Sequence, residues 1–215
     1  MKKLNKTQLL LTSLVCLAPI ILALVLWNKL PEQLPIHFNA AGEIDNYASK
    51  ALTCFGLPAM LLFFNLLLFF GINSDPKKGN ANGVIISIAI WICPVMSLII
   101  MPITLFKGMG YDIPVEIILP AMIGVLFIII GNYLPKSHQS YTVGIKLPWT
   151  LNDEENWNKT HRFAGFVWVI GGLLMLVSAF TGARMLVTLV VIAALVLLPL
   201  IYSYLLYRKK SAENK

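Results

Sequence analysis

The chain has 215 residues, of which 58% are hydrophobic and only 13% charged, and it carries a formal net charge of +7. Soluble proteins have roughly 25% charged residues, and a soluble domain of this length buries only about 70 to 75% of the surface of its unfolded chain. The composition therefore excludes an ordinary soluble domain and indicates a membrane protein. We expect no direct nucleic-acid partner, because membrane topology alone explains an excess of Lys and Arg.

Six apolar runs are long enough to cross a bilayer core, which takes about 20 helical residues. The backbone of a lipid-embedded segment must satisfy its own hydrogen bonds, and continuous apolar runs favour helices over a barrel. The predicted fold is an all-α membrane protein, a six-transmembrane-helix bundle surrounded by membrane lipid. The runs are Leu9–Trp27, Ala51–Ile72, Val84–Phe106, Ile113–Ile130, Phe163–Phe180 and Met185–Tyr207.

The first run follows three lysines, as a secretory signal peptide would. It is longer than the usual apolar region of about 7 to 15 residues in such peptides, and Leu24–Asn28 (LVLWN) is not a small-residue cleavage site. We interpret it as a retained transmembrane helix.

The distribution of Lys and Arg predicts the orientation. With a cytoplasmic N-terminus, 13 of these residues fall on the inner side and 4 on the outer side. Because inner connections of membrane proteins are enriched in positive charge, we predict a multi-pass plasma-membrane protein with both termini in the cytoplasm.

Two connections are longer than a turn requires, and long connections often carry function. The first, residues 28–50, contains HFNAAGEIDNYASK. Pro31 and Pro35 disfavour helix before them, and Ala40, Ala41 and Gly42 form a compact loop. We predict an extracellular cap that contains a short hairpin, with Gly42 at a left-handed backbone position.

The second connection, residues 132–162, starts irregular and ends helical. Asn152 fits a helix N-cap, because three acidic residues follow it. We predict a short cytoplasmic helix that begins near Asp153 and runs or bends into span five. Trp157 and His161 lie four residues apart and share a helix face. Trp149 and Trp157 read either as recognition anchors or as rings of the interfacial aromatic belt.

The sequence predicts no metal and no cofactor. Cys16, Cys54 and Cys93 fall inside apolar runs without paired spacing. His37, Glu43 and Asp45 are residue types that bind zinc or manganese, but a turn cap and solvated carboxylates explain them as well.

Two other functions stay open. A small transporter or flippase needs a polar pathway, for which Asn65, Glu116 and the prolines of the spans are hints. Glu116 lies in span four near its outer end, where it serves either a site or interfacial solvation. A membrane enzyme acting on lipid or peptide would start from His37 with Asp45, or from His161. No motif of a hydrolase or a nucleotide-binding loop is present, so we expect no enzyme.

Both long connections resemble a known family. LPEQLPIHFNAAGEIDNYASK is similar to a short domain of unknown function at the start of many Gram-positive membrane proteins. GNYLPKSHQSYTVGIKLPWTLNDEENWNKTHRFAG resembles the signature of the SdpI family, which gives immunity against the sporulation-delaying peptide toxin. The resemblance covers nearly the whole chain.

The resemblance implies a non-enzymatic immunity function. Family members protect the cell from a secreted peptide toxin, and some also recruit a cytoplasmic helix-turn-helix autorepressor to the membrane. It also divides the chain into an N-terminal two-helix unit with its extracellular cap (1–72), spans three and four (73–131), and the cytoplasmic motif with spans five and six (132–215).

The matching residues are candidate sites. The extracellular candidates, to which we add Glu116, are His37, Phe38, Gly42, Asp45, Tyr47 and Lys50. The cytoplasmic candidates, to which we add Lys146, are Asn132, Gly144, Pro148, Trp149, Trp157, Thr160 and His161. The family usually has Arg and Thr in place of Lys146 and Leu147, so this chain lacks a planar bidentate donor there. We expect span five, with Gly165, Gly171 and Gly172, to connect the two faces.

Overall fold

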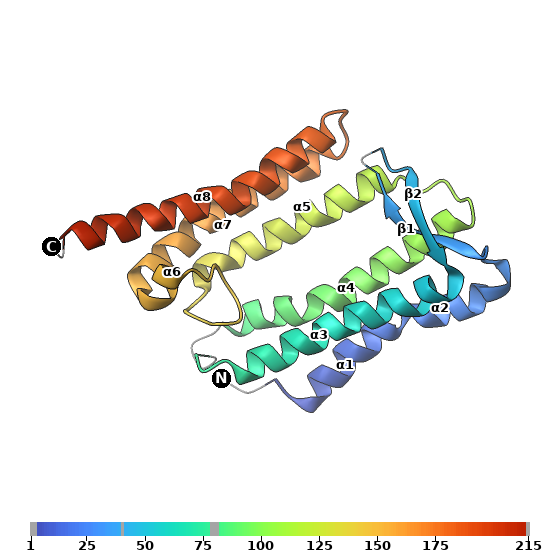
Figure 1. Ribbon diagram of the computed structural model, residues 1–215, viewed down its shortest axis with the longest axis horizontal. Helices are drawn as coiled ribbons and strands as arrows, with labels where there is room; N and C mark the ends of the chain where they lie inside the picture. The colour runs from blue at the N-terminus through green and yellow to red at the C-terminus, as the bar shows by residue number, and fades with distance from the viewer. Residues whose placement is uncertain (1–3, 40, 78–81, 214–215) are drawn as a thin grey trace. The chain divides into compact units, whose positions relative to one another are not determined.

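A computed structural model describes residues 4–39, 41–77 and 82–213. In this part of the chain six helices are long and apolar enough to cross a membrane, which confirms the predicted fold class (Figure 1). We number them as spans one to six: Lys6–Lys29, Leu52–Ser74, Gly83–Gly108, Val115–Lys136, Glu154–Ser178 and Arg184–Glu213. Ala40 of the predicted loop, and Lys2, Lys3, Lys78 and Lys215 of the charge count, lie outside the described residues.

The chain forms two compact units that interleave in sequence. The hairpin unit comprises Lys2–Asn73 and Ala89–Glu116, and the signature unit comprises Ser74–Ile88 and Ile117–Lys215. Each long connection therefore belongs to one unit, and each unit has its own packing.

Prolines shape the helices of the hairpin unit. Pro19 separates α1 (Lys6–Leu17) from α2 (Pro19–Leu26), and a short 3-10 turn, Trp27–Lys29, ends span one. Span two begins with a π-helical turn, η2 (Leu52–Gly56), and continues as α3 (Leu57–Ser74). The π turn ends two residues before Pro58, whose ring would otherwise clash with the carbonyl four residues earlier.

The predicted hairpin is present between spans one and two. β1 (Gln33–Phe38) pairs antiparallel with β2 (Ile44–Ser49), with irregular register around His37. Gly42 has φ of +80°, which confirms the expected left-handed position. The hairpin is fixed by Leu34, which is fully buried.

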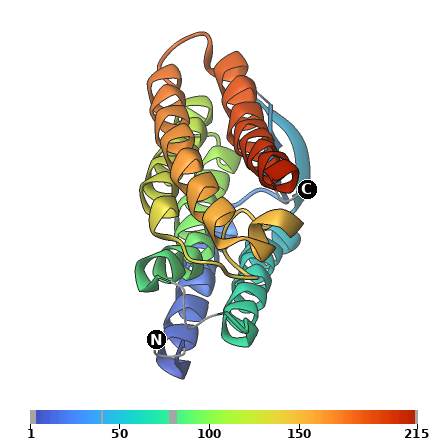
Figure 2. The same cartoon turned by 90° about the vertical axis from the view of Figure 1, so that its left-hand side faces the viewer.

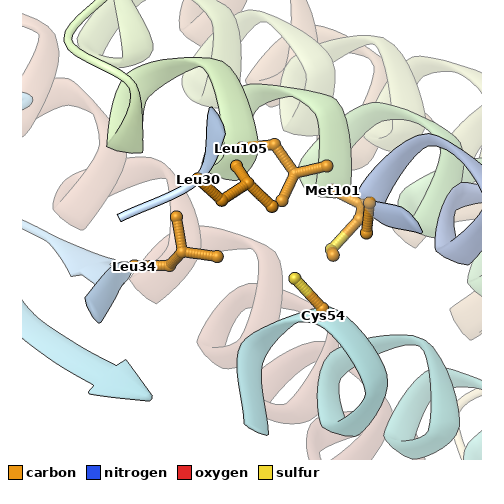
Figure 3. Packing of buried hydrophobic residues seen from close by; sticks show 6 residues of the cluster. Leu30, Leu34, Cys54, Met101 and Leu105 are labelled. Carbon is orange, nitrogen blue, oxygen red and sulfur yellow. The ribbon is translucent and has the colours of Figure 1, made fainter. Parts of the chain in front are cut away.

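The core beneath the hairpin joins residues from four elements. Figure 3 shows the side chains of Leu30, Leu34, Cys54, Met101 and Leu105 gathered together, and Ala23 completes the cluster. Met101 and Leu105 come from α4 (Gly83–Gly108). A Cβ on Gly108, the last residue of α4, would lie 3.0 Å from Pro35 Cδ, so the glycine lets β1 approach the helix.

The signature unit is helical. It contains α5 (Val115–Tyr133) from Ile117 onward, the 3-10 turn η4 (Leu134–Lys136), α6 (Pro148–Asn152), α7 (Glu154–Ser178) and α8 (Arg184–Glu213). The helices α7 and α8 lie side by side as an antiparallel hairpin in both views (Figures 1 and 2).

The helix predicted from about residue 153 is present and runs without a break into span five as α7, but its cap is one residue later than predicted. Asn152 is the last residue of α6, and the carboxylate of Asp153 accepts hydrogen bonds from the N–H groups of Glu155 and Asn156. The sequence PWTLN forms a helical turn of its own, started by Pro148. This turn uses Asn152 and leaves Asp153 to cap α7.

Glycines bring α5 and α7 into close contact. A Cβ on Gly124 would lie 2.7 Å from the Gly172 carbonyl oxygen, and a Cβ on Gly165 would lie 2.8 Å from the Gly131 carbonyl oxygen. Each helix thus contributes two glycines seven residues apart. Such positions let helix backbones meet at van der Waals distance in a membrane.

Polar side chains pair with carbonyls that prolines leave free. Pro94 cannot donate to Ile90, and Asn65 Nδ2 donates to the Ile90 oxygen at 2.7 Å. In the signature unit Pro199 leaves the Leu195 oxygen free, and Trp168 Nε1 donates to it at 3.2 Å. These bonds satisfy buried backbone groups in helices with proline. The first of them gives Asn65 a structural role.

Candidate functional site

The turn of the hairpin is organised by Asn39. Its Oδ1 accepts from the N–H groups of Ala41 and Glu43 at 2.9 and 3.0 Å, and its Nδ2 donates to the Glu43 carboxylate. A Cβ on Gly42 would overlap the carboxylate of Glu116. Glu116 therefore lies directly over the turn, and the structure brings these two candidates together.

The exposed side chains of the hairpin include a histidine–carboxylate pair and two apolar groups. His37 Nδ1 lies 2.6 Å from Asp45 Oδ1, and their side chains are 66% and 42% exposed. Ile36 and Tyr47 are each 51% exposed. A hairpin that exposes a histidine–carboxylate pair, an aliphatic group and an aromatic group can contact a partner that is both polar and apolar. Phe38 is half-buried.

Lys50 serves the base of the hairpin. Its ammonium lies 3.0 Å from Glu32 Oε1 and 3.3 Å from the Leu30 oxygen, and 5.0 Å from the centre of the Trp27 ring. These contacts tie the first residues of span two to the end of span one. Lys50 is therefore engaged within the chain.

In the signature unit, the loop of residues 137–147 has no helix or strand, so its backbone needs partners. Asp75, which is only 4% exposed, provides them. One of its oxygens accepts from Ser140 Oγ at 2.6 Å and from the N–H groups of Tyr141 and Thr142 at 2.8 and 3.0 Å. Its other oxygen accepts from the Lys77 N–H at 2.8 Å.

The electrostatics of Asp75 fit this role. Burial raises the pKa of its carboxyl, but the hydrogen bonds from Ser140, Lys77 and Thr142 outweigh burial and hold the pKa below its ordinary value. A carboxylate that accepts several N–H bonds stays ionised. Asp75 is thus an anionic anchor for the loop.

Lys77 strengthens the same junction. Its ammonium donates to Gln139 Oε1 at 2.9 Å and to the Leu151 oxygen at 3.2 Å, and lies 5.3 Å from the centre of the Tyr141 ring. The short connection after span two therefore holds the loop of 137–147 and the end of α6.

His161 and Trp157 of α7 pack beneath the loop of residues 137–147, and both are fully buried. Their rings stack with centres 4.0 Å apart. His161 Nε2 accepts from the Ile145 N–H at 2.8 Å, so Nδ1 carries the proton and donates to the Trp157 oxygen at 2.8 Å. Trp157 Nε1 donates to the Ser137 oxygen. Trp157 is therefore a core residue rather than a belt ring or an exposed anchor.

Gly144 fits between these rings. Its φ is +117°, and a Cβ there would lie 2.7 Å from His161 Nε2 and from the Trp157 ring. Only glycine suits both constraints. Thr150 fixes the loop next to it, since its Oγ1 donates to the Ile145 oxygen and accepts from the Leu147 N–H.

Trp149 docks α6 on α8. Its Nε1 donates to Ser203 Oγ at 3.0 Å, and its ring stacks on Tyr207 at 5.7 Å. Asn156 Nδ2 donates to the Ser203 oxygen, and Thr160 Oγ1 donates to Asn156 Oδ1 at 3.0 Å. Thr160 thus acts inside this packing.

A surface pocket of about 440 Å³ lies at this docking point. It is lined by Pro148, Trp149, Asn152, Asp153, Tyr207, Lys210 and Ser211. Lys210 Nζ lies 2.9 Å from Asp153 Oδ2 across it. Burial raises the pKa of Asp153, but the hydrogen bonds from Lys210 and Asn156 bring it below its ordinary value.

The cytoplasmic candidates therefore separate into two classes. Gly144, Trp157, Thr160 and His161 hold the fold, whereas Pro148 and Trp149 reach a pocket and Asn132 and Lys146 are exposed. Sequence reasoning missed Asp75, Lys77, Asn39 and Ser203. A single charged residue in a short connection, a single amide in the hairpin turn or a single hydroxyl in an apolar helix gave no pattern that would have marked them.

Within the described ranges, no group of three His, Cys, Asp or Glu side chains is placed to hold a metal ion. The His37–Asp45 pair is the one proposed enzyme seed that the structure brings into hydrogen-bond distance. His161 instead has both ring nitrogens in backbone hydrogen bonds.

Comparisons with known proteins match both segments. Residues 136–203 match the model of the SdpI/YfhL protein family, and residues 14–62 match a domain of unknown function, DUF1648. The chain is 29% identical over 203 residues to a protein of Bacillus subtilis (strain 168) named immunity protein SdpI, covering 94% of this chain and 96% of that protein. No solved structure gives a significant match.

Proposed function

Because the chain belongs to the SdpI/YfhL protein family through residues 136–203, we propose that it is a membrane immunity protein that protects its cell against a secreted antimicrobial peptide toxin. The observation that carries the proposal is similarity to an immunity protein over 94% of the chain. The proposed place is the plasma membrane, with both termini in the cytoplasm.

The exposed surface of the hairpin is the proposed toxin-contact surface. It combines exposed apolar groups, Ile36 and Tyr47, with the exposed His37–Asp45 pair, and it belongs to an ordered turn. Exposed aromatic groups on a rigid support lose little conformational freedom when they bind a partner. On the predicted topology this surface meets a peptide that arrives from outside.

A second activity, recruitment of a cytoplasmic helix-turn-helix repressor, is favoured by the pocket at Trp149. Connections one and four of a six-span protein alternate in side, so the predicted topology puts this pocket in the cytoplasm and the hairpin outside. Its lining offers an aromatic stack, Trp149 with Tyr207, beside a charged pair. Such a surface suits a side chain of a protein partner.

Survival of toxin-sensitive cells that produce each variant tests the immunity proposal. Asp45→Ala and Tyr47→Ala should lower resistance to purified sporulation-delaying peptide toxin by about tenfold or more, the scale of a contact residue at an interface. Asp112→Ala is the matched control, because that carboxylate is also exposed on the predicted outer side. Wild-type resistance of both hairpin variants, at equal protein levels, would reject the hairpin as the contact surface.

Recruitment is tested by the membrane localisation of a tagged repressor in the same cells. Trp149→Ala should abolish localisation while resistance persists, because the change lies in the pocket. Parallel loss of both activities in the hairpin and pocket variants would instead indicate one structural role for both segments.

A further inference from the structure

We propose that span two carries the state of the hairpin to the signature loop (residues 137–147), and that Asp75 is the positioning residue at its end. The inference deepens the proposed function, since it names the element that would couple toxin contact to the partner-binding side. It rests on that function only for its biological meaning, because the mechanical link can be measured without toxin.

Chain continuity is the first observation. Of the six spans, span two is the one that directly follows β2, with only Lys50 and Ala51 between strand and helix. It ends at Ser74, and the next residue is Asp75. A shift of β2 would therefore move the first turn of span two. The last turn of the same helix leads directly to Asp75, which anchors the signature loop.

The hairpin end of span two is firmly attached. Lys50 bonds to Glu32 and to the Leu30 oxygen, and its backbone N–H donates to the Glu32 oxygen at 2.8 Å. Cys54 of the π turn lies in the core with Leu34 of β1. The start of the helix therefore has to follow the hairpin rather than move independently.

The other end is attached to the signature loop by several bonds. Asp75 holds Ser140, Tyr141 and Thr142, and Lys77 holds Gln139 and the end of α6. Asp75 is almost fully buried, and loss of a buried acceptor leaves its donors unsatisfied. The loop therefore has to follow the end of span two.

Span five, the connection expected from sequence, has a different arrangement. Its beginning packs on the signature loop through Trp157 and His161, but its other end continues through residues 179–183 into α8. Its glycines pack against α5 and α8 inside the signature unit. It therefore has no chain link to the hairpin.

A double-mutant cycle tests the link in the full chain, in lipid nanodiscs, with the three native cysteines replaced by alanine. The exposed Lys146 is changed to cysteine as a reporter, and its maleimide reaction rate reports the order of the loop. Gly42→Ala perturbs the hairpin, because any Cβ there meets a left-handed backbone and the Glu116 carboxylate. Asp75→Ala removes the anchor.

We expect Gly42→Ala to raise the reaction rate by about twofold to thirtyfold, the range of coupling between distant sites. In the Asp75→Ala background the same change should have no further effect, since the link is already broken. Asp153→Ala is the matched control: this acid also caps an element beside the signature loop, but it bonds to α7 and Lys210. Gly42→Ala should retain its effect there.

Additive effects of Gly42→Ala and Asp75→Ala would overturn the proposal. The proposal would also be overturned if Gly42→Ala lost its effect in the Asp153→Ala background as it does in the Asp75→Ala background. The loss of effect would then come from a general loss of order in the loop and not from Asp75. If Asp75→Ala does not fold, Asp75→Asn keeps the size and removes the charge, and it should reduce the coupling. Failure of the immunity proposal would appear separately, as lack of toxin resistance with an intact cycle.

Discussion

At the scale of single residues, the signature loop is held by buried side chains that accept hydrogen bonds from its backbone. The carboxylate of Asp75 accepts from the N–H groups of Tyr141 and Thr142. Thr150 Oγ1 accepts from the Leu147 N–H, and His161 Nε2 accepts from the Ile145 N–H. A segment without helix or strand can be ordered only if such partners exist. The motif of this region is therefore mainly a folding motif, in which Pro148 and Lys146 are exposed and Trp149 is half-buried.

This division predicts different effects for two aromatic residues of the motif, His161 and Trp149. His161→Ala should lower the free energy of unfolding of the signature unit by about 1 to 3 kcal/mol or more, because it orphans the buried Ile145 N–H. Trp149→Ala should cost less, since Trp149 is half-buried and its partner Ser203 also bonds to its own helix. Thermal unfolding in detergent measures both, and the reverse order would contradict the division.

The anchor at Asp75 predicts a stability that depends on pH. Its folded pKa is below the ordinary value of about 3.9, so its contribution is complete above that value and is lost as the pH falls through the folded pKa. Denaturant unfolding between pH 3 and 7 should show weaker acid sensitivity for Asp75→Asn than for the wild type. The variant should also be less stable by about 1 to 3 kcal/mol at pH 7. Parallel pH curves for the two proteins would exclude this role.

At the scale of elements, the sequence predicted what hydropathy and turn chemistry determine. Six spans, the hairpin with Gly42 and the helix beginning near residue 153 are all present. The separate helix α6 and the π turn before Pro58 were not predicted, because each occupies about one turn and has no periodic signal. Asp75 could not be predicted either, since three of its four donors come from residues that only the folded chain brings near it.

Prolines and polar residues form pairs at this scale, and one pair gives a sharp prediction. Asn65→Leu should destabilise the hairpin unit by about 1 to 3 kcal/mol, because the Ile90 carbonyl loses its donor. In the Pro94→Ala background residue 94 regains an N–H for that carbonyl, so Asn65→Leu should cost much less. A double-mutant cycle by thermal unfolding measures the difference. Equal costs in both backgrounds would show that Asn65 acts by packing alone.

At the scale of the whole molecule, the split of 13 inner to 4 outer Lys and Arg residues predicts which side each long connection faces. Membrane-impermeant maleimide, added to intact cells, should label a cysteine at Ala41 and should miss one at Lys146.

Ser140, which lies in the same loop, is an unsuitable probe because it is 3% exposed and bonds to Asp75. Both probe positions belong to described, exposed residues, so a lack of labelling reports the membrane and not burial. After the cells are opened, the cysteine at Lys146 should react, which serves as its control. Labelling of Lys146→Cys and not Ala41→Cys in intact cells would reverse the topology and would place the hairpin away from any secreted toxin.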